Sequence, residues 1–163
     1  MASDILLILR CCLTRKPMPR YFSHEQATRL LPEVERLLRL AIHAQLVYKE
    51  ADEAISDLQQ RVQSMGGMVV DVSKTRRLQD ARQEGAKHLR EAIESITELG
   101  VQVKDLDVGL VDFPTTYHGE DVLLCWRLGE NGIGHWHGLS EGVRGRKPID
   151  PEFLQNHGGG GIH

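Results

Sequence analysis

One long apolar seam restricts the possible folds of this chain more than any other feature. From Val34 to Met65, apolar residues recur at alternating steps of three and four, so they share one stripe of an α-helix. The seam consists of Val34, Leu37, Ala41, Ala44, Tyr48, Ala51, Ile55, Leu58, Val62 and Met65. This heptad-like spacing predicts one long helix with a coiled-coil face, and such a face needs a partner helix to cover it.

Capping signals mark both ends of this helix. Ser23 and Gln26 have the spacing of a capping box, which predicts that a helix begins there. Pro32 lies a short way inside, and because proline removes a backbone donor we expect a kink or break, with Pro32 opening the main helix. Gly66 and Gly67 end the seam.

A second helix is expected after a short connection. Asp71 or Ser73 can cap it, and Gly100 stands where a left-handed residue closes a helix. Its inner face is formed by Leu78, Ala81, Gly85, Leu89, Ala92, Ile96 and Leu99. Because the connection is short, the two helices are expected to lie antiparallel. Their small residues allow close helix approach, within the chain or in a homo-oligomer.

After Gly100 the apolar period changes from helical to alternating, which is typical of strands. The clearest strand is 122–128, and the Asn131-Gly132 turn predicts a β-hairpin with 133–137 as the partner. Two shorter apolar pieces precede it, at 101–104 and at 110–114, where proline is expected to end the strand. The predicted fold class is α+β: a long antiparallel helical hairpin followed by a small antiparallel β segment.

The chain length suits one domain. The composition, with 40% hydrophobic and 26% charged residues, is that of a globular protein and argues against disorder. The expected parts are an N-terminal disordered extension at 1–19, one α+β domain at 20–150 and a flexible Gly/His tail at 151–163. Within the domain, the helical hairpin covers 20–100 and the β segment covers 101–150.

Charge and cysteine content exclude several classes of function. The net charge of −3 and the absence of a long basic run argue against nucleic acid or an anionic membrane as a partner. No stretch is apolar enough to span a bilayer. Three cysteines without a C-x-x-C motif form no disulfide framework, so a reducing cytoplasm is the expected setting.

The histidine pair His135 and His137 is the first candidate site. Two imidazoles at positions i and i+2 of a strand project from one face, where they can chelate a divalent metal. The alternatives are a structural role, in which His137 is held by hydrogen bonds beside a tryptophan, and ligand binding without a metal. If the hairpin loop has an even number of residues, Cys125 points to the opposite face and cannot join them, unless a β-bulge shifts the register. The remaining ligands would be carboxylates from Asp105, Asp107, Asp112 or Glu130.

Charged residues of the last third are the second candidate site. The aspartates Asp105, Asp107 and Asp112 either fix turns through backbone amides or do acid/base work, partly buried against an arginine. The available arginines are Arg127, Arg144 and Arg146. The loop that contains Arg144, Arg146 and Lys147 suits capture of one anion, or is a surface loop paired with an aspartate.

Three stretches together resemble a bacterial family known only as domain of unknown function 2203. They are Tyr21–Ser23 with Leu30–Pro32, Val103–Pro114, and Leu124–Glu130 with Trp136-His137 and Gly145–Ile149. The resemblance covers residues 20–149 and implies a fold and localisation but no established activity. It picks out Asp105, Asp107, Asp112, Trp126, Glu130, Trp136, His137 and Arg146. His135 is less clearly part of this pattern, which weakens the histidine-pair hypothesis.

Three functions remain open at this point. The first is a binding module whose polar pocket takes an anionic small ligand, with or without a divalent metal, through Asp105, Asp107, Asp112, Arg127 and Arg146. The second is an enzyme in which His137 is the general base, with Asp112 and Glu130 as further catalytic candidates. The third is an interaction or oligomerisation module that docks through its helices. The first two require the charged groups to converge.

Overall fold

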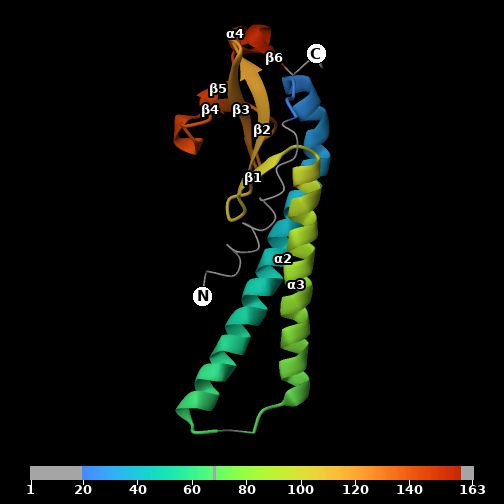
Figure 1. Cartoon of the computed structure of the whole chain (residues 1–163), viewed down its shortest axis with the longest axis vertical. Coiled ribbons are helices and arrows are strands. Elements are labelled where there is room, and N and C mark those ends of the chain that lie inside the picture. Colours follow the sequence, from blue (N-terminus) through green and yellow to red (C-terminus); the bar gives the residue numbers. More distant parts are fainter. Residues whose placement is uncertain (1–19, 68, 159–163) are drawn as a thin grey trace.

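The computed structural model describes residues 20–67 and 69–158. Within them, the chain forms a long helical hairpin with a six-stranded antiparallel sheet beside one end (Figure 1). The hairpin consists of α2 (His24–Ser64) and α3 (Val72–Glu98). No helix of this part is long and apolar enough to cross a membrane. The predicted α+β class is confirmed.

The start of α2 follows its local sequence. The Ser23 side chain accepts a hydrogen bond from the Gln26 backbone N–H, and the Gln26 side chain accepts one from the Ser23 N–H, which completes the capping box. The expected break at Pro32 is wrong, because α2 continues through it. Ala27 and Val34 on either side are fully buried, and their packing outweighs the roughly 3 kcal/mol that an interior proline costs a helix.

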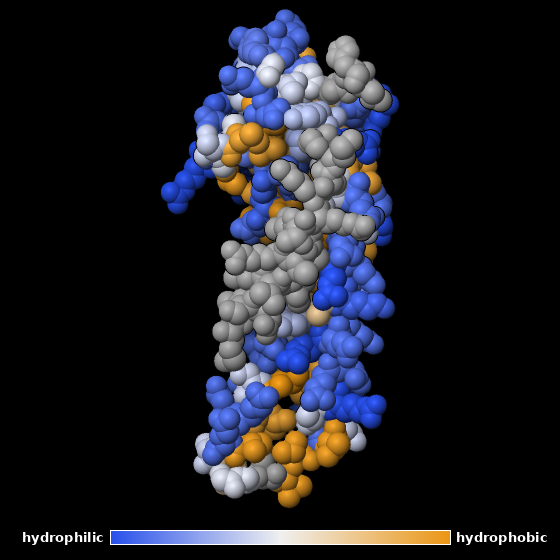
Figure 2. Space-filling view, in the orientation of Figure 1, coloured by the Kyte–Doolittle hydropathy of each residue, from blue (hydrophilic) through white to orange (hydrophobic). Residues whose placement is uncertain are grey.

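The apolar seam of α2 is covered along only part of its length. Its members from Val34 to Ile55 are buried against α3 and the sheet, whereas Met65 is 67% exposed. Figure 2 shows apolar residues gathered at this far tip of the hairpin, where Val69 and Val72 are also exposed. The two helices approach each other closely at Gly85, where an added Cβ would lie 2.9 Å from the backbone N of Tyr48.

The sheet has the strand order β1-β2-β3-β4-β5, with β6 paired to the other end of β2. Its strands are β1 (Gln102–Asp105), β2 (Leu110–Tyr117), β3 (Glu120–Arg127), β4 (His135–Gly138), β5 (Lys147–Pro148) and β6 (His157–Gly158). Pro114 lies inside β2 and does not end it. The reason is that β1 pairs with β2 only up to Asp112 and β6 begins at Thr116, so Pro114 sits in a gap between them.

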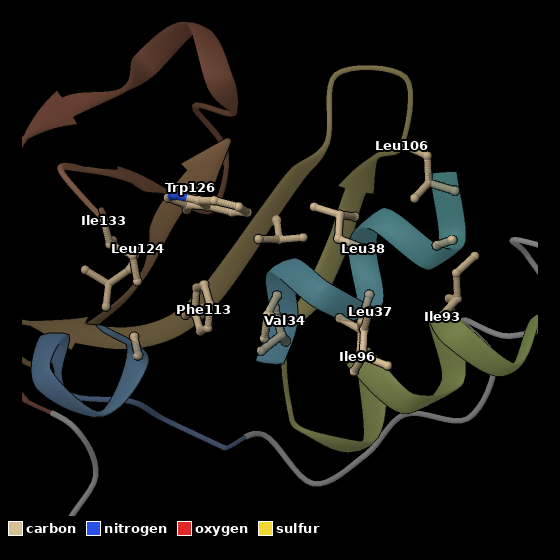
Figure 3. Packing of buried hydrophobic residues seen from close by; sticks show 14 of the residues in the cluster. Val34, Leu37, Leu38, Ile93, Ile96, Leu106, Phe113, Leu124, Trp126 and Ile133 are labelled. Carbon is tan, nitrogen blue, oxygen red and sulfur yellow. The ribbon is translucent and has the colours of Figure 1, made fainter. Parts of the chain in front are cut away.

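One face of this sheet packs on the helices and forms the core. Phe113 of β2 and Leu124 and Trp126 of β3 contact the cluster formed by Val34, Leu37 and Leu38 of α2 with Ile93 and Ile96 of α3 (Figure 3). Side chains alternate along each strand. The intervening residues, among them Asp112 and Cys125, therefore point to the opposite face, away from the helices.

The C-terminal part of the described chain is ordered. A 3-10 helix at Val143–Gly145 precedes β5, and α4 (Pro151–Asn156) follows it. The Phe153 ring stacks on Tyr117 and Trp136, with ring centroids 5.0 and 4.9 Å away, and is fully buried. The expectation of a flexible tail from residue 151 is therefore wrong up to residue 158. The predicted extension at 1–19 and the remainder of the tail lie outside the described residues.

Candidate metal centre

The register of β3 and β4 decides which side chains share a face. Cys125 pairs with His135 and Leu123 pairs with His137, so Cys125 and His137 lie on the same face. The expected register, which separated them, is wrong. The connection between the strands covers 128–134, an odd number of residues, and not the four-residue turn assumed from Asn-Gly. Each side chain of β4 therefore faces the side opposite to the expectation.

Three strands bring together a cluster of Asp112, Cys125 and His137. Asp112 pairs directly with Cys125 across β2 and β3, and His137 comes from β4. One ligand atom of each residue lies within 4.8 Å of the others, and His137 Nε2 is 3.3 Å from Asp112 Oδ2. The exposed fractions are 1% for Asp112, 0% for Cys125 and 2% for His137. The cluster is thus inside the protein, on the sheet face away from the helices.

The imidazole of His137 is held in one orientation. Its Nδ1 lies 2.9 Å from the backbone oxygen of Gly138. A carbonyl oxygen only accepts, so Nδ1 donates, and in the neutral ring Nε2 carries the lone pair. Within the described residues, neither Nε2 nor either carboxylate oxygen of Asp112 has a hydrogen-bond partner. Three potential metal-binding atoms of the described chain are therefore buried without a hydrogen bond, although Asp112 Oδ2 is in ionic contact with His137 and Lys104.

Burial raises the pKa of the Cys125 thiol to about 12, and the negative charge of Asp112 contributes to the rise, while Arg146 opposes it. In a protein without metal, Cys125 is therefore a neutral thiol at physiological pH and a poor nucleophile. Coordination to a metal deprotonates such a thiol outright. As a metal ligand, Cys125 would therefore act as a thiolate.

A partly buried ion pair borders the cluster. Arg146 donates two hydrogen bonds to the Glu130 carboxylate, at 2.8 and 2.7 Å, and a third at 3.3 Å to the backbone oxygen of Cys125. Arg146 was expected as a clamp for an anion. Because Glu130 already binds its guanidinium group on two nitrogens, the pair instead joins the loop after β3 to the segment before β5.

The pH dependence of stability should reveal this pair. Burial alone would raise the pKa of Glu130, but hydrogen bonds from Arg146 and the Arg127 backbone outweigh it, and the pKa lies below its ordinary value of 4.5. A carboxylate whose pKa is lower in the folded than in the unfolded protein stabilises the fold at pH values above the unfolded-state pKa. This stabilisation is lost as the pH falls through the folded-state pKa. We expect Glu130→Gln to lower the unfolding free energy by about 2 kcal/mol at pH 7.

Urea unfolding at several pH values measures this difference between wild type and Glu130→Gln. The two proteins should converge in stability as the pH falls below the ordinary glutamate range. The matched control is Glu141→Gln, because Glu141 forms a pair with Lys147 that is more exposed and therefore contributes less. A constant difference across the pH range would contradict the proposed contribution of the ionised carboxylate.

The other predicted site residues do not join the cluster. Asp105 Oδ1 accepts hydrogen bonds from the backbone of Asp107 and Val108 and fixes the turn before β2, as the structural interpretation predicts. Asp107 is exposed and bonds Lys49. Arg127 is also exposed, with its Nε 3.9 Å from Glu130 Oε1.

His135 likewise stays outside the cluster. It lines an open pocket with Glu130, His24 and the loop before β4. The histidine pair is therefore divided: His137 belongs to the buried cluster and His135 does not. Sequence reasoning missed Cys125 as a member, and the signal that could have found it was the length of the connection after β3.

The donor set of the cluster suits a transition metal. Zinc is bound by thiolate, imidazole and carboxylate, usually with tetrahedral geometry. Two nitrogen or oxygen ligands that are each about 2.0 Å from a tetrahedral zinc ion lie about 3.3 Å apart, which equals the separation of His137 Nε2 and Asp112 Oδ2. The Cys125 sulfur lies within 4.8 Å of ligand atoms of both residues. Three ligands leave a fourth position for another donor.

Comparison with known proteins gives a family but no activity. The family described as "Uncharacterized conserved protein (DUF2203)" matches residues 20–149, a range that includes both helices of the hairpin and all three members of the cluster. No curated protein and no solved structure matches the chain.

Proposed function

We propose that this chain, which belongs to the DUF2203 family of uncharacterised conserved proteins, is a metal-binding module that holds one ion of the zinc class on Asp112, Cys125 and His137. The observation that supports this proposal most is the convergence of three buried side chains whose ligand atoms lie within 4.8 Å of one another. They come from three neighbouring strands, so the sheet itself fixes their positions.

A purely structural role explains this cluster less well. A buried carboxylate that only stabilises the fold is normally satisfied by hydrogen bonds, and each unsatisfied polar group costs about 1–3 kcal/mol. Among the described residues, Asp112 Oδ2 has ionic contacts with His137 Nε2 at 3.3 Å and Lys104 Nζ at 3.8 Å, but neither the two Asp112 oxygens nor His137 Nε2 has a well-formed hydrogen bond. A bound dication would satisfy all three atoms at once and would use the cysteine as well.

The mixture of sulfur, nitrogen and oxygen donors favours zinc or a similar ion over magnesium or calcium. Magnesium and calcium prefer oxygen ligands, whereas thiolate and imidazole suit softer transition metals. The hydrogen bond from His137 Nδ1 to the Gly138 oxygen is the kind of outer-shell contact that orients a metal-binding histidine. The metal of the first functional hypothesis is therefore kept with His137 and Asp112 as ligands, and Cys125 takes the place that was expected for His135.

The enzyme hypothesis has less support from the geometry. His137 as a general base must come within hydrogen-bond reach of a substrate proton, but its side chain is 3% exposed and faces Asp112. Arg146, the intended anion clamp, is bound to Glu130. We therefore keep metal binding as the function and assign no reaction.

Metal analysis and cobalt spectroscopy test this proposal directly. Untagged full-length protein should retain close to one zinc ion per chain after dialysis. Replacement by cobalt should give a thiolate-to-cobalt charge-transfer band, because Cys125 is a ligand. Cys125→Ser should remove that band and lower zinc affinity by at least about 100-fold, since loss of a first ligand exceeds the 10–100-fold effect of an outer-shell change.

The matched control uses the two other cysteines. Cys11 and Cys12 are adjacent in the sequence and lie outside the described residues, so a Cys11→Ser/Cys12→Ser variant should keep the band and the affinity. A charge-transfer band that persists in Cys125→Ser and disappears in the double variant would refute the proposed site.

A further inference from the structure

We infer that Lys104 is a tethered cation that neutralises Asp112 in the metal-free protein and is displaced when the metal ion binds. This inference rests on the proposed metal site and adds its regulation: an exchange between a lysine ammonium group and a dication on one carboxylate. Lys104 Nζ lies 3.8 Å from Asp112 Oδ2, the same oxygen that lies 3.3 Å from His137 Nε2.

A β-bulge directs Lys104 to this position. Gln102 pairs with Asp112 and Val103 pairs with Val111, but Asp105 and not Lys104 pairs with the next residue of β2, Leu110. Lys104 is therefore the extra residue of the bulge, on the strand at the edge of the sheet. Bulges at sheet edges often redirect a side chain toward a functional site. The Lys104 ammonium group also donates a hydrogen bond of 2.8 Å to the side-chain oxygen of Gln102. Gln102 is the residue of β1 that pairs with Asp112.

The exposures at the cluster distinguish Lys104 from the metal ligands. The side chain of Lys104 is 39% exposed, whereas that of Asp112 is 1% exposed. Cys125 and His137 are buried to a similar degree as Asp112. Lys104 thus connects the buried carboxylate to solvent at the open edge of β1. Movement of this flexible side chain would free the Asp112 oxygen that also faces His137.

Electrostatics makes the two cations alternatives. An ammonium group and a metal ion on the same carboxylate oxygen would lie only a few ångströms apart, where like charges repel strongly in a partly buried setting. Without metal, the ammonium group offsets the charge of buried Asp112, which is costly to leave unpaired. With metal, it must turn toward solvent. Each cation therefore lowers the affinity of the site for the other, as linkage requires.

Uncharged substitutions of Lys104 test this exchange. Lys104→Met keeps the aliphatic stem, and isothermal titration of the metal-free variant with zinc should show an affinity about 10- to 100-fold higher than that of wild type, within the usual range of coupling between sites. Lys104→Gln should shift the affinity in the same direction. Lys104→Arg keeps the charge and should stay near wild type. Without zinc, Lys104→Met should unfold at lower temperature than wild type, and saturating zinc should remove this difference.

Lys49→Met is the matched control. Lys49 has a similar exposure of 42% and also pairs with an aspartate, Asp107, at 3.1 Å, but it lies away from the cluster. Its substitution should leave zinc affinity unchanged. Equal affinity of wild type, Lys104→Met and Lys104→Gln would overturn the exchange while the metal site stands. Weaker binding in both uncharged variants would also overturn it, because Lys104 would then support the ion. Absence of zinc binding in all variants would refute the metal site itself.

Discussion

Replacing Asp112 by asparagine is expected to abolish most zinc binding while leaving the fold intact. The change keeps the shape of the side chain but removes the charge that faces His137 and Lys104. A neutral amide oxygen is a weak ligand for a transition metal beside a thiolate and an imidazole. We expect zinc affinity to fall at least about 100-fold, more than the change expected for outer-shell substitutions.

Stability measured with and without zinc distinguishes a binding role of Asp112 from a structural one. Wild type at zinc concentrations about 1,000 times the dissociation constant should gain about 4 kcal/mol of unfolding free energy. Asp112→Asn should lack this gain, and its metal-free stability should match or exceed that of wild type, because burying a carboxylate is costly even when it is paired and Lys104 is exposed enough to be solvated without it. A substitution that stabilises the fold but weakens binding is typical of a residue that serves a functional site.

The matched control is Asp107→Asn, which changes an exposed aspartate of the preceding turn. It should keep the full zinc response. A metal-free Asp112→Asn protein that is strongly destabilised, together with an unchanged zinc response of the folded fraction, would show that Asp112 serves the fold and not the ion.

Replacing Trp126 by alanine is expected to cause the largest loss of stability in the sheet. Trp126 is 1% exposed and lies in the core between β3 and α2 (Figure 3). Its indole N–H also donates to the backbone oxygen of Glu130 at 3.2 Å, which holds the loop that carries the ion pair with Arg146. Truncation of a buried tryptophan removes about 3–5 kcal/mol, and the lost hydrogen bond adds to this effect.

Urea unfolding monitored by far-ultraviolet circular dichroism measures this loss. The other tryptophan supplies the control: Trp136 is only half-buried and lies against Tyr117, Phe153 and Lys147, so Trp136→Ala should be clearly less destabilising. Trp126→Phe should recover most of the packing and keep zinc binding, because Trp126 and Cys125 face opposite sides of the sheet. Equal losses for both alanine variants would contradict the location of the core.

Sequence patterns identify only some of the residues of the site. The prediction that charged residues of the last third converge identified Asp112 and His137, which the structure brings to 3.3 Å. It placed Arg146 as a free clamp, although Glu130 already binds it. It also excluded Cys125, because the assumed turn length set the wrong register. An error of one residue in a β-hairpin moves every side chain to the other face, so motif recognition without the register could not assign the ligands.

The sequence by itself determined the features that depend on neighbouring residues. The seam from Val34 to Ile55, the capping box at Ser23 and the left-handed Gly100 arise from periodicity and local hydrogen bonds, and the structure contains all three. The tertiary structure alone decided the continuity of α2 through Pro32, the burial of Phe153 and the meeting of Cys125 with His137. These depend on packing and strand register between segments far apart in the chain, whose free energies can outweigh or redirect local preferences.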